Sequence, residues 1–101
     1  MATTAKTVKG KITQLTIHAD NWNDMNNPGT GCFCIYMNEL PQASPDGYKR
    51  VIVTKTHPAF SEIVQVALSA QSRNANVELT YLESHIVRAN SWDFGVLSIM
   101  Y

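Results

Sequence analysis

The clearest periodic pattern of apolar positions lies in residues 58–73, PAFSEIVQVALSAQSR. Apolar residues recur there three and four positions apart, which is the spacing of one helix face; they are Phe60, Ile63, Val64, Ala67 and Leu68. Pro58 suits a first helical turn, and either Thr56 or His57 can cap it, Thr56 being the better acceptor. Asn74 tolerates the left-handed conformation that ends a helix. We therefore expect one amphipathic helix here.

The opposite face of this helix lacks the lysine and glutamate pairs of an ordinary solvent-exposed face. It consists mostly of small or uncharged polar residues, namely Ser61, Glu62, Gln65, Ser69 and Ser72. Two interpretations follow. The helix is simply exposed and rich in serine and glutamine, or it packs beside copies of itself around a polar channel.

The remaining pattern predicts strands. We expect five of them, at residues 7–18, 32–37, 48–54, 75–82 and within 86–101. In the first, the apolar phase slips between Ile12 and Leu15, which predicts a bulge, and Gly10 permits a sharp bend. A second break or bulge is expected near Trp92 and Phe94.

The predicted element order is β-β-β-α-β-β, with a long bent first strand and a helix between strands three and four. This order is that of the OB-fold, a mainly β, five-stranded barrel. We therefore expect one OB-fold domain over residues 1–101, with residues 1–6 flexible.

Residues 32–37, CFCIYM, are apolar on both faces of the expected strand. Only one face can meet the core of so small a domain, so we expect a subunit interface to cover the other. Cys32 and Cys34 share a face, and a disulfide between them would distort the strand. Because a C-x-C pair alone is a weak metal signal, we expect buried structural thiols and no metal.

Charge and composition narrow the function. Eight Lys and Arg residues balance eight Asp and Glu residues, whereas nucleic-acid binders usually carry a basic excess. No apolar run approaches the ~18 residues of a membrane span. No nucleophile or carboxylate stands in a recognisable spacing to His18, His57 or His85, so we expect neither an enzyme nor a cofactor. The start of the chain lacks the apolar segment of a signal peptide.

Several short segments, taken together, resemble one family. They are Gly10 with Ile12-Thr13-Gln14-Leu15, Phe33-Cys34-Ile35, Ala59-Phe60-Ser61, residues 77–81 and Val96-Leu97-Ser98. Over residues 7–98 the chain resembles the receptor-binding B subunits of bacterial toxins in which one A chain sits on five B chains, in particular the subtilase-cytotoxin and typhoid-toxin (pertussis-like) B subunits. The resemblance implies a homopentameric OB-fold ring with a role in virulence. Such rings bind sialylated or other surface glycans and receive the A chain's tail in a helix-lined pore.

The resemblance also implies where a glycan would bind. The family's pocket uses a Ser before the strand-one Gly, an acid after the Phe-Cys-Ile segment and a Tyr in strand four. The corresponding neighbourhoods here hold Lys9, Tyr36, and Thr80 with Tyr81, without the Ser and the acid. The family's disulfide partner in strand three is also absent. Trp22 is an aromatic residue in a polar loop, and it either caps the barrel or offers a flat face to a sugar or a partner. Together with the four residues above, it completes our set of five candidate ligand-binding residues. Lys9 would pair with a glycan carboxylate.

Three functional hypotheses remain open. The first is a glycan-binding B-type subunit in a homopentamer, secreted or periplasmic after removal of a leader. The second is a cytoplasmic homopentameric OB-fold ring with a structural or protein-partner role. The third and weakest is a single-strand nucleic-acid binder, in which Tyr36, Tyr48 and Tyr81 would stack on bases.

Overall fold

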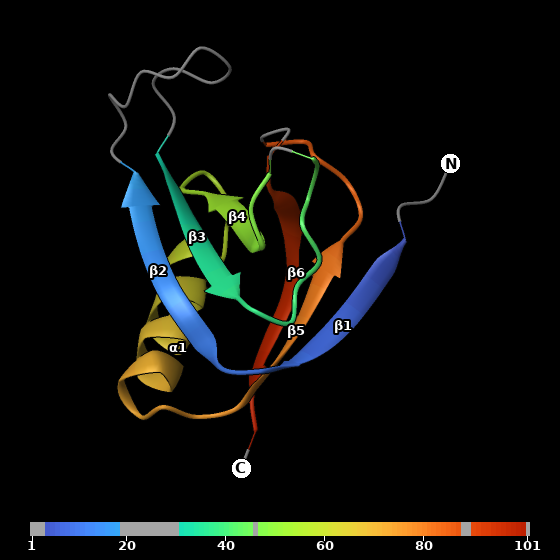
Figure 1. The fold of residues 1–101 in the computed structure, drawn as a ribbon. Helices are drawn as coiled ribbons and strands as arrows, with labels where there is room; N and C mark the ends of the chain where they lie inside the picture. Colours follow the sequence, from blue (N-terminus) through green and yellow to red (C-terminus); the bar gives the residue numbers. More distant parts are fainter. Residues whose placement is uncertain (1–3, 19–30, 46, 88–89, 101) are drawn as a thin grey trace.

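The computed structural model describes residues 4–18, 31–45, 47–87 and 90–100 (Figure 1). It is mainly β, as predicted, with six strands and one helix. In chain order the elements are β1 (Ala5–Gly10), β2 (Ile12–His18), β3 (Cys32–Met37), β4 (Arg50–Thr54), α1 (Phe60–Ser72), β5 (Val77–Leu82) and β6 (Trp92–Ile99). Within the described residues, no helix is long and apolar enough to cross a membrane.

All six strands belong to one sheet, in the order β1-β5-β6-β4-β3-β2. The predicted first strand is two strands, because the chain turns at Lys11, one residue after the expected hinge at Gly10. The two halves lie at opposite ends of the sheet order (Figure 1). Since no ladder joins them in the described part of the chain, the sheet curls without closing into the expected barrel. Ala5 and Lys6 pair with Leu82 and Tyr81, so the expectation that they are flexible was wrong.

Both predicted irregularities are present. The β2–β3 register shifts between Ile12 and Gln14, where the apolar phase slips. In β6, Phe94 pairs with Tyr81 and Val96 with Thr80, so Gly95 is the extra residue of a bulge. A Cβ atom at Gly95 would lie 2.6 Å from the Thr80 carbonyl oxygen, which explains why glycine occupies the bulge.

The main core lies between the helix and the inner face of the sheet. Phe33, Ile35 and Met37 of β3 enter it, and the Phe33 ring meets Phe60 of α1 edge-on at 6.4 Å between centroids. The helix buries Ile63, Ala67 and Ala70. Leu68, which we placed on the buried stripe, is 51% exposed. That assignment was wrong because the buried face is centred on Ile63, Ala67 and Ala70, and at 3.6 residues per turn Leu68 falls outside this face.

The two ends of α1 differ from each other in how well the sequence predicted them. The helix begins after Ala59, which carries no side-chain cap, and of the two expected caps Thr56 is not used, since its hydroxyl bonds to that of Thr54. The ring of His57 instead accepts a hydrogen bond at Nδ1 from the Ala59 amide, at 3.0 Å. At the other end Asn74 adopts φ 52°. The amides of Asn74 and Ala75 bond back to the last turn, which is the Schellman arrangement and confirms the predicted stop.

The outer face of β3 is covered by the chain itself. Cys32, Cys34 and Ile52 form a second buried cluster, against which Tyr36 and Val87 pack. Val87 belongs to the segment between β5 and β6, which folds over this face. The prediction of buried thiols is confirmed, since both cysteines are buried and free. The expectation that a subunit interface covers them was wrong, because the long return from β5 to β6 supplies the cover.

Candidate ligand-binding site

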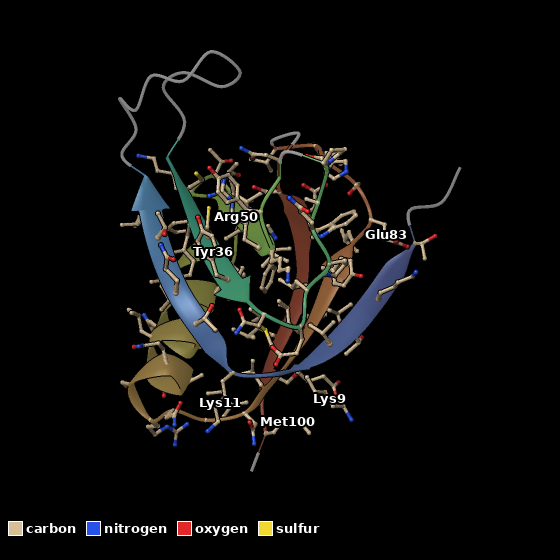
Figure 2. The ribbon with its side chains drawn as sticks, in the orientation of Figure 1. Lys9, Lys11, Tyr36, Arg50, Glu83 and Met100 are labelled. Carbon is tan, nitrogen blue, oxygen red and sulfur yellow. The ribbon has the colours of Figure 1, made fainter. Side chains whose placement is uncertain are left out.

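Two of the candidate residues lie on the outer face of the β1–β5 pair, and each already has a partner. Lys9 is opposite Glu78 in the register, and its Nζ lies 3.7 Å from the Glu78 carboxylate. Thr80 shares a 2.8 Å hydrogen bond with Thr7 through their side-chain oxygens. Figure 2 shows Lys9 pointing outward near the end of β1. This surface is exposed, and its groups satisfy one another.

Tyr81 points the other way. Alternation along β5 places it in the core, where it is 3% exposed and its ring packs against Trp92 at 5.3 Å between centroids. A ligand on the outer face of the sheet cannot reach it. Trp22 lies outside the described residues. The structure therefore does not bring the candidate residues together into one site.

Tyr36 lies elsewhere, in a cluster that we did not predict. On the outer face of the sheet, Tyr36 of β3 is directly opposite Arg50 of β4, and the Arg50 Nη1 donates to the Tyr36 hydroxyl at 2.5 Å. The guanidinium carbon lies 4.4 Å from the ring centroid of Tyr48 and 5.5 Å from that of Tyr36. We refer to Tyr36, Tyr48 and Arg50 as the arginine–tyrosine cluster (Figure 2 labels two of its members).

The guanidinium of this cluster is almost completely buried, with Arg50 6% exposed. Its Nε donates to Ser91 Oγ at 2.6 Å and its Nη2 to Asn90 Oδ1 at 3.2 Å. Within the described residues, no carboxylate lies within ion-pair distance of it. Among the described residues, neutral oxygens and two aromatic faces surround its charge.

Of the two tyrosines, Tyr48 is the exposed one and Tyr36 is half-buried. Tyr48 is 49% exposed, and its ring meets that of Tyr36 edge-on at 6.4 Å between centroids. Since the Tyr36 hydroxyl oxygen accepts from Arg50, its own proton remains available as a donor. The cluster thus presents an aromatic face, a phenol donor and the amide of Asn90. Aromatic faces beside fixed polar groups suit a ligand that is apolar on one side and rich in hydroxyls on the other.

Sequence reasoning named Tyr36 but missed Arg50 and Asn90 as its partners. The signal available in the sequence was weak. Arg50 opens a strand whose next residues, Val51, Ile52 and Val53, are all buried, so an arginine there has to find partners. Which partners it finds depends on the β3–β4 register and on the return segment, and neither can be read from spacing.

The two thiols lie next to this cluster, and each changes the pKa of the other. The pKa of Cys34 is raised, first by its hydrogen bond with Cys32 and then by burial. The pKa of Cys32 is lowered from its ordinary value, first by that same hydrogen bond and, against the effect of burial, also by the nearby Arg50 charge. Within the described residues, no three His, Cys, Asp or Glu side chains converge as metal ligands.

Comparison with protein-family models, with curated proteins and with solved structures finds no match to this chain.

Proposed function

We propose that the chain is a non-catalytic, glycan-binding B-type subunit, which assembles into a homopentameric OB-fold ring and carries a toxin A chain at a helix-lined pore. The observation that carries the binding part of this proposal is the arginine–tyrosine cluster. The exposed Tyr48 ring offers its face to the C–H groups of a sugar, while the Tyr36 hydroxyl and the Asn90 amide meet its hydroxyl groups.

Rigidity favours this use of the cluster. The Tyr48 ring rests on a guanidinium that is fixed by three hydrogen bonds to side chains. A fixed aromatic face loses little conformational entropy on binding, which is a large cost when mobile side chains close on a ligand. The cluster replaces the outer β1–β5 face as the proposed glycan site, because Lys9 and Thr80 there are paired with neighbours.

The ring part of the proposal rests on α1 and on the strand order. All five polar residues of its predicted channel face, Ser61, Glu62, Gln65, Ser69 and Ser72, are exposed. Leu68 adds an exposed apolar side chain beside them, which a neighbouring helix would cover. The placement of β1 and β2 at opposite ends of one curled sheet supports the OB-fold assignment.

A glycan array with the purified chain tests the binding function, with Tyr48→Ala and Lys49→Ala as matched variants of adjacent exposed residues. We expect saturable binding by the wild type, a loss of about tenfold or more in Tyr48→Ala, and little change in Lys49→Ala. The basis is that an aromatic contact at a site centre is worth ~1–3 kcal/mol. Equal binding by all three proteins would remove the cluster from the site, and no binding to any glycan would contradict the function.

A further inference from the structure

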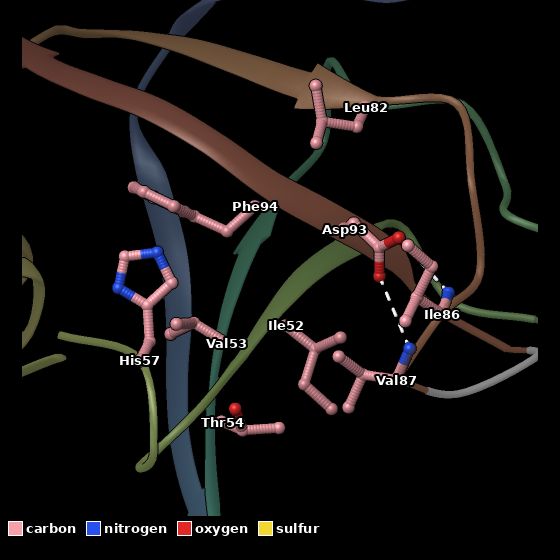
Figure 3. A pocket seen from close by; sticks show the side chains of 9 residues that line it. All are labelled: Ile52, Val53, Thr54, His57, Leu82, Ile86, Val87, Asp93 and Phe94. Atoms are coloured by element: carbon pink, nitrogen blue, oxygen red, sulfur yellow. Dashed lines mark hydrogen bonds between the residues drawn. The ribbon is translucent and has the colours of Figure 1, made fainter. Parts of the chain in front are cut away.

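A pocket of about 180 Å³ opens beside β4 and β6, and none of the three residues of the arginine–tyrosine cluster lines it. Its origin is the sheet topology. β4 and β6 are parallel and pair only at Val51 with Trp92 and at Ile52 with Asp93. Beyond these pairs the strands separate, since β6 continues along β5 and β4 ends at Thr54. The pocket lies where they part (Figure 3).

The wall of the pocket is mostly apolar. Six apolar side chains contribute to it, namely Ile52, Val53, Leu82, Ile86, Val87 and Phe94. In another protein, an engineered cavity of about 150 Å³ lined by similar residues binds benzene. The volume here therefore suits a molecule of about six to eight heavy atoms.

Two of the three polar residues in the wall have their polar atoms engaged. The Asp93 carboxylate accepts from the Ser84 hydroxyl and from the amides of Ile86 and Val87, the latter two at 3.0 and 3.4 Å. Figure 3 shows both amide bonds at the edge of the pocket. The Thr54 hydroxyl shares a 3.0 Å hydrogen bond with that of Thr56. Neither residue is therefore free to bind a charged group.

The third polar residue, His57, has one ring nitrogen without a hydrogen-bond partner among the described residues. Its Nδ1 accepts from the Ala59 amide, so in the neutral ring the proton must lie on Nε2. This N–H is bound by no described residue. It gives His57 a ring donor to offer to a ligand, across from the apolar side chains of β6 and the return segment (Figure 3).

We propose that this pocket binds a small, uncharged, largely apolar molecule that carries one hydrogen-bond acceptor, such as a ketone or an ether. The apolar wall receives the body of the ligand, and His57 Nε2–H donates to its acceptor. A charged ligand is disfavoured because the wall is mostly apolar and its one carboxylate, that of Asp93, already accepts three hydrogen bonds from the chain. This inference stands independently of the proposed glycan binding, since the two sites share no residue.

The rim of the pocket supports a binding role. Ile86 is 84% exposed although it borders an apolar pocket. Its backbone is nevertheless held in place, because its amide donates to Asp93 Oδ2. An isoleucine that is fixed in position and exposed is poised to cover a bound ligand, and the contact would remove its apolar surface from water.

The test uses the full chain labelled with ¹⁵N and follows its amide signals while each probe is added. Cyclohexanone is the first probe, and methylenecyclohexane is its isostere without the acceptor. We expect saturable shifts at Ile86, Val87 and Phe94 with cyclohexanone, and affinity about fivefold weaker with the isostere, which corresponds to one neutral hydrogen bond. Cyclohexanecarboxylate should bind more weakly than either.

Three variants link the binding to the pocket. Thr54→Phe should fill the space and abolish the shifts, with Leu82→Phe filling it from another wall if the first variant does not fold. His57→Asn keeps an acceptor for the Ala59 amide but removes the ring donor, so cyclohexanone should bind it no better than the isostere does. The proposal is wrong if cyclohexanone shifts no wall residue, if a folded filled variant binds it unchanged, or if the carboxylate binds best. Glycan binding should be unaffected by all three variants.

Discussion

At the scale of single residues, Arg50 connects several separate parts of the chain. Its guanidinium joins β3 through Tyr36, the loop before β4 through Tyr48, and the segment before β6 through Asn90 and Ser91. Because Ser91 is completely buried, the hydrogen bond that it accepts from Arg50 has no replacement from solvent. The arginine thus fixes the return segment over the thiols as well as the tyrosine rings.

We expect Arg50→Met to lower the free energy of unfolding by about 3 kcal/mol, since a buried network loses its charged donor while its acceptors stay buried. Urea unfolding followed by circular dichroism measures the change. Lys49→Ala is the matched control, because Lys49 is exposed, and it should change stability by less than about 0.5 kcal/mol. Similar losses in both variants would mean that the network contributes little.

The thiol pair predicts a fall in stability at alkaline pH. An unperturbed cysteine thiol has a pKa of 9.0, and the pKa of Cys34 is raised above this value in the folded state. The stabilisation by the protonated Cys34 is therefore complete below pH 9 and is lost as the pH rises further. Cys32, with its lowered pKa, contributes stability that is already present above pH 9 and does not offset the loss.

Unfolding by urea, with reducing agent present, measures this dependence between about pH 8 and pH 10.5. We expect the free energy of unfolding to fall above pH 9 by up to about 1.4 kcal/mol per pH unit. Cys34→Ala should remove most of this slope. A slope that is the same in the variant would assign the alkaline loss to other groups.

At the scale of elements, glycines decide where the sheet bends, and they do so for different reasons. A Cβ atom at Gly95 would meet the backbone of Thr80 across the bulge. At Gly10 its three nearest atoms would all belong to the carboxylate end of the Glu39 side chain, the first at 2.3 Å. A side-chain end can rotate away, whereas the paired β5 backbone can move only if the β5–β6 ladder shifts.

The two glycines therefore make a matched pair for substitution. We expect Gly95→Ala to cost about 2–3 kcal/mol of unfolding free energy because it strains the bulge, and Gly10→Ala to cost less than about 1 kcal/mol because Glu39 swings out. Thermal or urea unfolding of the two variants under identical conditions measures the difference. If Gly10→Ala were the more damaging, Glu39 would have to be held in place more firmly than its exposed position indicates.

At the scale of the whole molecule, the proposed ring depends on which surface the copies share. The outer face of β3 around Cys32 and Cys34 is already covered by the chain's own return segment, so this part of the face cannot serve as the shared surface. The helix offers Leu68, 51% exposed, within a polar face. Val96 is similarly exposed, at 55%, but alternation places it on the outer face of β6, away from α1. Substitutions at Leu68 and at Val96 therefore test whether the copies share the helix or the sheet.

Light scattering of the purified chain should give five times the protomer mass of 11.2 kDa. Leu68→Lys should reduce the mass to that of the protomer, since five like charges would meet around the pore. Val96→Lys should leave the pentamer intact. A monomeric wild type would contradict the ring, and a pentamer dispersed only by Val96→Lys would move the interface to the sheet.

Much of the secondary structure could be predicted from the sequence because it depends on neighbours along the chain. Strict alternation identified β5, and the left-handed Asn74 marked the end of α1. The phase slip between Ile12 and Leu15 located the first bulge. The helix start was predicted only as a choice between Thr56 and His57, and the structure uses the His57 ring, which accepts from the amide two residues further on.

The candidate site was less predictable. Tyr81 was a ligand-binding candidate by analogy, but it alternates in phase with the buried Val77 and Leu79, and this shared face is the core. Tyr36, Tyr48 and Arg50 come into contact only because separate segments of the chain pack together. The pocket between the separated strands likewise forms only when distant segments pack together. Local spacing carries no information about such encounters between distant residues.

The sequence by itself determined the mainly β class, the single helix, the position of the bulges and the burial of the thiols, because apolar periodicity and turn chemistry act over a few residues. Only the tertiary structure decided that the first strand divides between two ends of the sheet, that the chain covers the outer face of β3 itself, and that Arg50 is surrounded by tyrosines. These outcomes depend on which strands pair and where the return from β5 to β6 folds, and pairing is settled by the packing of the whole chain.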